Sequence, residues 1–196
     1  MKSAYSYIQD AWNKPSPELD KIWKERLIKW RREPVSLRIE HPTRLDRARA
    51  LGYKAKKGYF IVRIKLRRGG RQRPKFAGGR KSSKMRRMKI VDMNYQWVAE
   101  QRANKHYKNA EVLNSYFVAK DGKHYWYEII LVDRSLVGTY EGMEWLRDDA
   151  NKGRVYRGLT SAARRSRGLL GKGKGYEKMR PSKKANKMRR LVKAKL

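Results

Sequence analysis

Two long runs of strand-forming residues, joined by a turn dipeptide, constrain the fold of this chain more than any other feature. Residues 112–120 and 123–133 are rich in β-branched and aromatic side chains, and Asp121-Gly122 separates them. Asp-Gly is favoured in tight two-residue hairpins, so the sequence predicts two antiparallel strands joined there. The second run is apolar at odd and even positions from Tyr125 to Val132, apart from Glu128. This pattern predicts a central strand that is covered on both faces.

A third strand is predicted over residues 59–67. Alternate positions from Phe60 to Leu66 are apolar, whereas the positions between them, from Ile61 to Arg67, are mostly basic. The alternation indicates one face toward a core and one face that is more than half cationic. Residues 69–74 and 77–84 then form a tract rich in glycine and basic residues, without periodicity and almost without apolar side chains. In isolation such a tract is expected to be disordered.

Two amphipathic helices are predicted before residue 35. Apolar residues recur at helical spacing over residues 4–13 after a Ser3 cap, and Ser16-Pro17 marks the start of the second helix, which Pro34 ends. The apolar stripe of the second helix is expected to pack in a core and consists of Leu19, Ile22, Trp23, Leu27 and Trp30. Residues 35–42 are expected to form an extended connection.

Shorter helical segments are predicted along the rest of the chain. Thr43, with Asp46 three residues later, resembles a capping box, and Gly52 suits the C-terminal cap of that helix. A helix after Thr160 or Ser161 is expected to be closed by Gly168. The other predicted helical segments run from Asp92 or Asn94 to Lys105, as short turns within 135–151, and from 181–182 toward residue 196.

Charge is distributed unevenly along the chain, whose net charge is +34. Residues 44–89 contain 19 Lys and Arg against one acid, and residues 152–196 contain 17 against one. The remaining residues are neutral overall, with 16 basic and 16 acidic side chains. We therefore predict a core domain over residues 1–151, with an inserted basic segment at about residues 67–90, and a basic C-terminal extension over residues 152–196.

Two cationic blocks of this size call for an anionic partner, because their self-repulsion destabilises a compact state. Nucleic acid fits best, since the planar fork of arginine suits phosphate oxygens and glycine lets the backbone approach closely. An anionic membrane is the rival, but a peripheral membrane helix needs an apolar face, and these blocks are rich in glycine and arginine. RNA is favoured over DNA because no groove-reading helix pair, zinc finger or basic zipper is recognisable. The aromatic motif of the common RNA-binding sheet domain is also absent, so contacts to RNA shape and backbone are expected to dominate over base reading.

The sequence lacks the residues that several other classes of function require. No cysteine is present and the three histidines stand at no metal-ligand spacing, so no metal and no cofactor is expected. Gly168 and Gly173-Lys174 imitate a phosphate-binding loop, but Gly175 replaces the required Ser or Thr and no strand precedes the segment. We therefore expect no enzyme activity and no small-molecule substrate. The longest apolar run has four residues, 129–132, and the start lacks a signal-peptide core, so a cytoplasmic protein without a membrane partner is expected.

Several motifs, in order along the chain, closely resemble one family. They are residues 51–59 (LGYKAKKGY), 67–74 (RRGGRQRP), 112–116 (VLNSY), 127–133 (YEIILVD) and 157–169 (RGLTSAARRSRGL). These motifs are similar to those of the L-fifteen-e family of large-ribosomal-subunit proteins of archaea and eukaryotes, with an archaeal pattern. The resemblance extends from residue 3 to about residue 175.

The resemblance implies an α+β fold, in which helices cover a small, mainly antiparallel sheet and long basic extensions bind RNA. It implies a structural constituent of the cytoplasmic ribosome that binds large-subunit ribosomal RNA and neighbouring ribosomal proteins and has no enzymatic activity. The rival from another class is a non-ribosomal RNA-folding or nucleic-acid-condensing protein, and a cationic enzyme acting on RNA is a third interpretation. We expect RNA contacts from Arg44, Arg47, Arg49, Lys54, Lys56, Lys57, Arg63, Arg67, Arg68, Arg71, Arg73, Arg80, Lys81, Lys84, Arg86, Arg87, Arg157, Arg164, Arg165, Arg167, Lys172 and Lys174.

Overall fold

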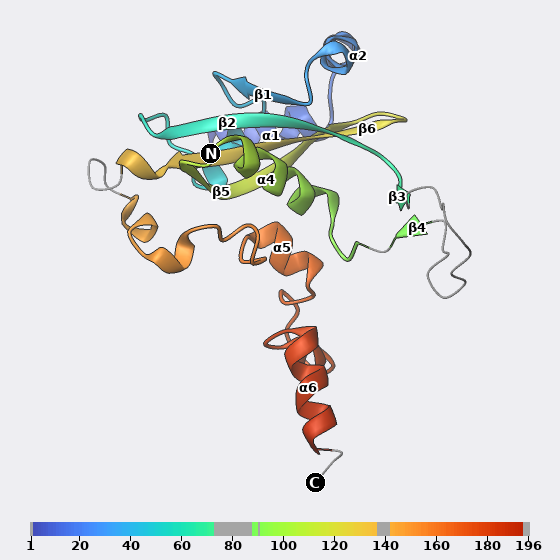
Figure 1. Ribbon diagram of the computed structural model, residues 1–196. Helices are drawn as coiled ribbons and strands as arrows, with labels where there is room; N and C mark the ends of the chain where they lie inside the picture. Colours follow the sequence, from blue (N-terminus) through green and yellow to red (C-terminus); the bar gives the residue numbers. More distant parts are fainter. Residues whose placement is uncertain (1, 73–87, 90, 137–141, 194–196) are drawn as a thin grey trace, which may run out of the picture.

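A four-stranded antiparallel sheet forms the centre of the protein. The structure is a computed structural model that describes residues 2–72, 88–89, 91–136 and 142–193. The strands of this sheet are β1 (Ser36–Ile39), β2 (Tyr59–Arg67), β5 (Ala110–Lys120) and β6 (His124–Asp133), in the order β1-β2-β6-β5. Figure 1 shows helices on both faces of the sheet. The predicted α+β fold is confirmed, and β6 is a central strand, as its apolar pattern predicts.

The first face of the sheet is covered by α4 (Tyr95–His106) and α5 (Ser161–Ser166). Both helices begin at the caps that the sequence predicts, because Asn94 Oδ1 accepts a hydrogen bond from Trp97 N at 2.8 Å and Thr160 Oγ1 accepts one from Ala163 N at 3.3 Å. Side chains from β2, β5, β6 and both helices form one buried cluster here. Val155, which precedes α5, is also fully buried in this cluster, so the core extends beyond residue 151 and includes the first part of the C-terminal basic block.

The second face is covered by α1 (Ala4–Asn13), α2 (Pro17–Arg32) and α3 (Leu45–Ala50). A continuous series of indole rings connects these helices with the sheet. The ring centroids lie 4.3 Å apart for Trp12 and Trp23, 5.8 Å for Trp23 and Trp30, and 6.1 Å for Trp30 and Trp126 of β6. Aromatic pairs at these distances stabilise a core beyond the area that they bury. The predicted packing role is thus confirmed for Trp23 and Trp30.

Only the C-terminal part of the α2 stripe reaches the core. Trp30 is buried, whereas Leu19 and Ile22 are 37% and 44% exposed. The prediction that the whole stripe packs in a core is therefore wrong for Leu19 and Ile22. Figure 1 shows α2 apart from the sheet, and the residues of its stripe that pack in the core are Trp23, Leu27 and Trp30. At the C-terminal end of α2, Arg31 Nε donates a hydrogen bond to Asp121 Oδ2 at 2.9 Å.

Three local predictions need correction. The expected connection over residues 35–42 contains β1, which pairs with β2 from Ser36↔Ile64 to Ile39↔Ile61. Thr43 does not cap α3, because Arg44 occupies the N-cap position without a side-chain hydrogen bond and the Thr43 side chain turns to Glu128. In both cases contacts with distant residues override the local pattern.

The third correction concerns the tip of the hairpin between β5 and β6. Asp121 N donates to His124 O at 3.0 Å, so Gly122 and Lys123 form the tip in place of the expected Asp121-Gly122. The Asp121 side chain instead accepts hydrogen bonds from the backbone N–H groups of Lys123 at 2.7 Å and His124 at 2.5 Å. Although burial opposes its ionisation, these bonds and the one from Arg31 hold the pKa of Asp121 at about 2.

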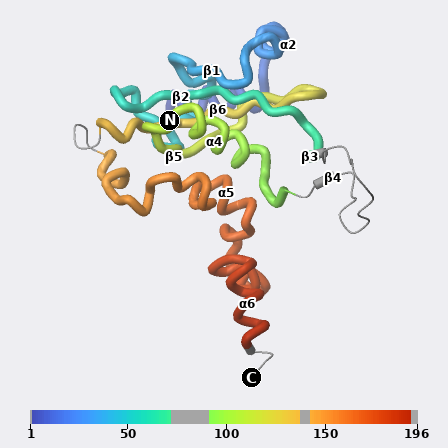
Figure 2. Tube along the Cα trace, in the orientation of Figure 1, coloured from blue at the N-terminus to red at the C-terminus, as the bar shows by residue number. Residues whose placement is uncertain are grey.

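The basic segments leave the sheet in two directions. β3 (Arg71–Gln72) pairs with β4 (Met88–Lys89) at the end of β2, and the tract between these strands lies outside the described residues. The predicted short turns follow β6 as η2 (Arg134–Leu136), η3 (Glu144–Leu146) and η4 (Asp149–Asn151). After α5, η5 (Tyr176–Met179) leads to α6 (Lys183–Lys193). Figure 2 shows α6 away from the sheet.

Candidate nucleic-acid interface

Most of the expected RNA-binding cations that the structure describes lie on the surface. Within the described part of the chain, the exposed ones are Arg47, Arg49, Lys54, Lys56, Lys57, Arg67, Arg68, Arg71, Arg157, Arg164, Arg165, Lys172 and Lys174. None of these forms an ion pair with an acid that the structure describes. Their positive charges are therefore available to an external anion. Arg73, Arg80, Lys81, Lys84, Arg86 and Arg87 lie outside the described residues.

Two expected RNA-binding residues are instead engaged inside the protein. Arg63 of β2 is 8% exposed, its Nη2 lies 2.6 Å from Glu33 Oε2, and its guanidinium lies 4.4 Å from the centroid of the Trp30 ring. Arg44 pairs with Asp46 at 2.9 Å and lies over the Trp12 ring. We leave Arg63 out of the candidate interface, since its charge is matched and buried. Arg44 is a weaker candidate than its exposed neighbours for the same reason.

Three other candidates hold backbone carbonyls in place. Arg68 Nη1 donates to Asp121 O at 2.6 Å. Arg157 donates to Lys152 O at 2.5 Å and also to Ala150 O, whereas Arg167 Nη1 donates to Gly158 O at 2.9 Å. A guanidinium has five N–H donors, so these side chains keep donors for a phosphate. Their loss will nevertheless affect folding as well as binding.

Two buried glutamates, which the sequence does not reveal as anchors, hold basic elements on the sheet. Glu100 of α4 is fully buried and accepts hydrogen bonds from Ser115 Oγ and Thr160 Oγ1, both at 2.5 Å. Burial raises the pKa of Glu100, while the two hydroxyls and the Arg154 charge oppose the rise. Because Thr160 is also the N-cap of α5, this carboxyl group ties the start of the basic helix α5 to the sheet.

Glu128 of β6 has the corresponding role on the second face. Its carboxylate accepts hydrogen bonds from Thr43 N at 3.0 Å, from Thr43 Oγ1, and from the Tyr116 hydroxyl at 2.6 Å. Burial raises the pKa of Glu128, and the bonds from Thr43 and Tyr116 and the Arg63 charge oppose the rise. Thr43 directly precedes Arg44, the N-cap of the basic helix α3, so Glu128 fixes where Arg47 is presented.

The two basic blocks meet at the start of α4. The Tyr95 hydroxyl accepts a hydrogen bond from Gly69 N at 2.9 Å and donates one to Gly69 O at 3.0 Å. The neighbouring Asn94 N donates to Ser166 Oγ at 3.1 Å, and Asn94 Nδ2 donates to Ala162 O at 2.9 Å. We call Gly69, Asn94, Tyr95 and Ser166 the α4 junction. It brings Arg67 and Arg68 of the first block near the helix that carries Arg164 and Arg165 of the second.

A separate basic group lies at the other end of β2. Lys54, Lys56 and Lys57 precede this strand, whereas Arg67 ends it. A nine-residue strand is about 30 Å long, so the lysine group and the α4 junction are at opposite ends of the sheet. The cations therefore form at least two separate surfaces, which suits an extended polyanion better than a small anionic ligand.

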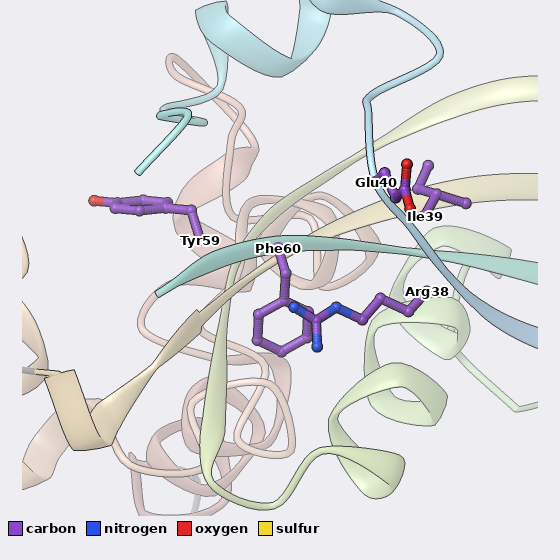
Figure 3. A pocket seen from close by; sticks show the side chains of 5 residues that line it. All are labelled: Arg38, Ile39, Glu40, Tyr59 and Phe60. Atoms are coloured by element: carbon purple, nitrogen blue, oxygen red, sulfur yellow. The ribbon is translucent and has the colours of Figure 1, made fainter. Parts of the chain in front are cut away.

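No convergent catalytic site is visible in the described part of the protein. A hollow of about 430 Å³ is lined by Arg38, Ile39, Glu40, Tyr59 and Phe60. Figure 3 shows Arg38 lying along the Phe60 ring, at 4.9 Å from its centroid, while Tyr59 points away from both. Among the described residues we find no group of three His, Asp or Glu side chains placed to hold a metal ion. None of the described helices is long and apolar enough to cross a membrane.

Fold and charge together define a small α+β protein with strongly cationic segments on its surface. The family described as Ribosomal L15 matches residues 3–186. Large ribosomal subunit protein eL15 of Methanocella arvoryzae is 48% identical over 193 residues, which cover 96% of this chain and 98% of the relative. The proteins of the same name from Nanoarchaeum equitans and Picrophilus torridus are 47% and 49% identical, over 93% and 95% of this chain and 97% of each relative.

The chain therefore belongs to the ribosomal L15 family, which is a family of ribosomal proteins and not an enzyme class. This membership confirms the resemblance seen in the sequence motifs. All three relatives come from archaea, in agreement with the archaeal pattern of the sequence.

Proposed function

We propose that this protein is a structural constituent of the large ribosomal subunit that binds and stabilises the folded large-subunit ribosomal RNA. Its archaeal relatives are named as large ribosomal subunit proteins. The observation that carries the RNA-binding role is the α4 junction, where Tyr95 contacts Gly69 of the first basic block and Asn94 contacts Ser166 of the second. Two segments far apart in sequence thereby present their arginines from one rigid base. The protein works in the cytoplasmic ribosome, beside neighbouring ribosomal proteins.

The placement of the acids supports this function. Glu100, Glu111 and Glu128 are buried, and Asp46 is buried in its pair with Arg44. These four acids therefore interact with groups inside the protein, whereas most of the cations lie on the surface of a chain whose net charge is +34. Such a surface is stable in compact form when phosphates surround it, because they remove the repulsion among the cations.

The binding residues that we propose are the exposed cations of the two blocks. Arg67, Arg71, Arg164 and Arg165 are the central ones, because none of them donates a side-chain hydrogen bond to another residue that the structure describes. The six candidates outside the described residues belong to the proposal on the strength of the sequence alone. We also infer that the basic C-terminal arm from Lys172 through α6 contacts RNA and that the protein has no catalytic activity.

Salt dependence tests the RNA-binding role. The logarithm of the association constant for transcribed large-subunit RNA is expected to fall with the logarithm of salt concentration by about 0.7–0.9 per phosphate contacted, so a dozen contacts give a slope of about −8 to −11. A slope near −2 would contradict phosphate neutralisation as the driving force. The variant Arg164→Gln with Arg165→Gln is expected to bind more weakly and to make the slope shallower by up to about two units.

A matched control removes two charges from the other face. Lys21 and Lys29 of α2 are exposed and lie outside both basic blocks. Lys21→Gln with Lys29→Gln changes the net charge by the same amount, so it separates local phosphate contacts from a general loss of positive charge. An equal effect of both double variants would contradict the proposed interface.

Sedimentation separates the ribosomal role from that of a free RNA-folding protein. A structural constituent is expected to remain with large subunits, at one copy per subunit, when native lysate is centrifuged in high salt. A helper that binds RNA transiently is mostly released under these conditions, because its binding depends on phosphate contacts alone.

A further inference from the structure

Four aromatic rings gather on the first face of the sheet, next to the α4 junction. Phe117 of β5 lies opposite Tyr127 of β6, and their ring centroids are 5.7 Å apart. Tyr125 lies 6.3 Å from both of these rings and 4.9 Å from Tyr95 of α4. We call Tyr95, Phe117, Tyr125 and Tyr127 the aromatic platform. β5, β6 and α4 each contribute to it, so its geometry is set by the fold.

Core packing explains the three tyrosines better than it explains Phe117. The tyrosines are half-buried and pack against the cluster beneath α4. Phe117 is 40% exposed and belongs to none of the buried clusters or their margins. A phenylalanine that leaves 40% of its surface in water gains less from burial in the free protein than a core residue does. Its exposure at the edge of a ring cluster therefore points to an external partner.

The charges around the platform identify the chemistry of that partner. The Arg68 guanidinium lies 5.0 Å from the centroid of the Tyr125 ring, and Arg71 is exposed three residues further along the chain. Asp121, whose backbone oxygen Arg68 contacts, has its carboxylate engaged by Arg31, and its side chain is only 9% exposed. A flat apolar surface beside unmatched cations suits a ligand that is both flat and anionic. A nucleobase with its phosphate has these two properties, whereas an apolar protein segment leaves the cations unmatched.

The platform and the cations are held in a fixed relation. The Tyr95 hydroxyl makes two hydrogen bonds to the backbone of Gly69, which directly follows Arg68. Arg68 itself donates to Asp121 O at 2.6 Å, at the tip of the hairpin that carries the other rings. A base on the rings and a phosphate at Arg68 thus meet groups that are already positioned, which lowers the entropic cost of binding.

We propose that the aromatic platform stacks an unpaired base of the bound RNA, with Phe117 as the exposed ring, while Arg68 contacts the adjacent phosphate. The inference rests on the proposed function, because it requires RNA as the partner. Stacking tolerates any base, so the site adds affinity for a single-stranded or bulged nucleotide without reading its identity. This site explains how a chain without the sheet motif of common RNA-binding domains still offers rings to a base.

The test compares the affinity and salt slope of Phe117 variants, with transcribed large-subunit RNA as the probe. Phe117→Ala is expected to weaken binding about 5- to 150-fold, the range for one stacked base. Its salt slope is expected to equal that of the parent, because no charge is removed. Arg67→Gln is the contrasting variant, and its slope is expected to be shallower by up to about one unit.

Two further variants separate stacking from apolar contact. Phe117→Tyr is expected to bind like the parent because it keeps the ring, whereas Phe117→Leu keeps an apolar side chain and is expected to lose most of the affinity that Phe117→Ala loses. Thermal unfolding is measured for each variant to check that it is folded. The comparison of Phe117→Leu with Phe117→Tyr remains decisive even if Phe117→Ala is unstable.

Two results would overturn the platform. If Phe117→Ala binds RNA as tightly as the parent, no base stacks on this ring. If Phe117→Leu binds as tightly as the parent, any apolar side chain suffices, as for contact with a protein neighbour. Both results leave the steep salt slope of the parent intact. A shallow slope of the parent itself would instead refute the RNA-binding function on which the platform rests.

Discussion

Replacement of Arg63 distinguishes a buried structural charge from an RNA contact. The sequence places this arginine on the basic face of β2 among the RNA-binding candidates, whereas the structure buries it between Glu33 and Glu128. The variant Arg63→Gln removes the cation from this cluster and leaves the Glu128 carboxylate, which is fully buried, without a neighbouring positive charge. It also removes the contact with the face of Trp30.

The expected cost follows from burial. Removing one partner from a buried ion pair destabilises a protein by about 3–5 kcal/mol, since a charge is left in a medium that solvates it poorly. Glu33 is 17% exposed and recovers part of its hydration, so Glu128 carries most of the loss. A lost cation–π contact adds about 1 kcal/mol, and we expect a total near the range for the ion pair. For a chain of this size each kcal/mol lowers Tm by about 2–4 °C, which gives a decrease of about 6–20 °C.

Arg67→Gln is the matched control, because Arg67 lies on the same face of the same strand and is exposed. Its Tm is expected to stay within about 2 °C of the parent, as for most surface substitutions. Thermal unfolding and RNA titration are carried out on both variants. Folded Arg63→Gln is expected to keep the parental affinity and salt slope, while Arg67→Gln loses affinity. If Arg63→Gln unfolds at the same temperature as the parent and makes the salt slope of RNA binding shallower by one unit, Arg63 contacts RNA and the structural assignment is wrong.

Three further variants test the core, the hairpin and the cap of α5. Ile130→Ala is expected to lower the free energy of unfolding, measured by chemical denaturation, by about 2–5 kcal/mol, because Ile130 is fully buried. The salt slope of RNA binding is expected to stay unchanged. Asp121 has a pKa of about 2 against an ordinary value of 3.8, so the stability that its charge provides is present above about pH 3.8 and is lost as the pH falls through 2. The free energy of unfolding of Asp121→Asn is expected to lack this acid dependence. If the variant and the parent have the same pH profile of stability, the charge of Asp121 does not have this role. Thr160→Ala removes both the cap of α5 and a bond to Glu100, at a cost of about 1–3 kcal/mol. Hydrogen exchange is expected to show faster opening of α5 with β6 still protected, and uniform loss of protection would argue against a local cap.

Local signals in the sequence predict most of the elements. The β2 alternation, the helix starts at Ser16 and Asn94 and the helix after Thr160 all occur where the residues place them. Such signals succeed because caps and periodicity depend on neighbours within one or two turns. The strand over Ser36–Ile39 was not predictable in this way, since its four residues acquire their pairing from β2.

The candidate interface was predictable in its charge but not in its geometry. The concentration of cations in two blocks follows from counting residues, and the exposed positions of Arg67 and Arg164 agree with it. The burial of Arg63, for which we leave it out of the candidate interface, depends on Glu33, thirty positions away, and on Glu128. Periodicity assigns Arg63 to a face of β2, but it does not reveal that α2 and β6 bring carboxylates to that face.

The sequence by itself determined the class of protein, the family, the helices and strands with local signatures, and the two cationic segments, because each of these is written in adjacent or regularly spaced residues. Only the tertiary structure decided which charges are neutralised internally, how Glu100 and Glu128 anchor two basic helices, and that Tyr95 and Asn94 join both basic blocks. It also assembled the rings of β5, β6 and α4 into one platform. These features arise from contacts between segments far apart in the chain, and such contacts exist only after the sheet and its covering helices have formed.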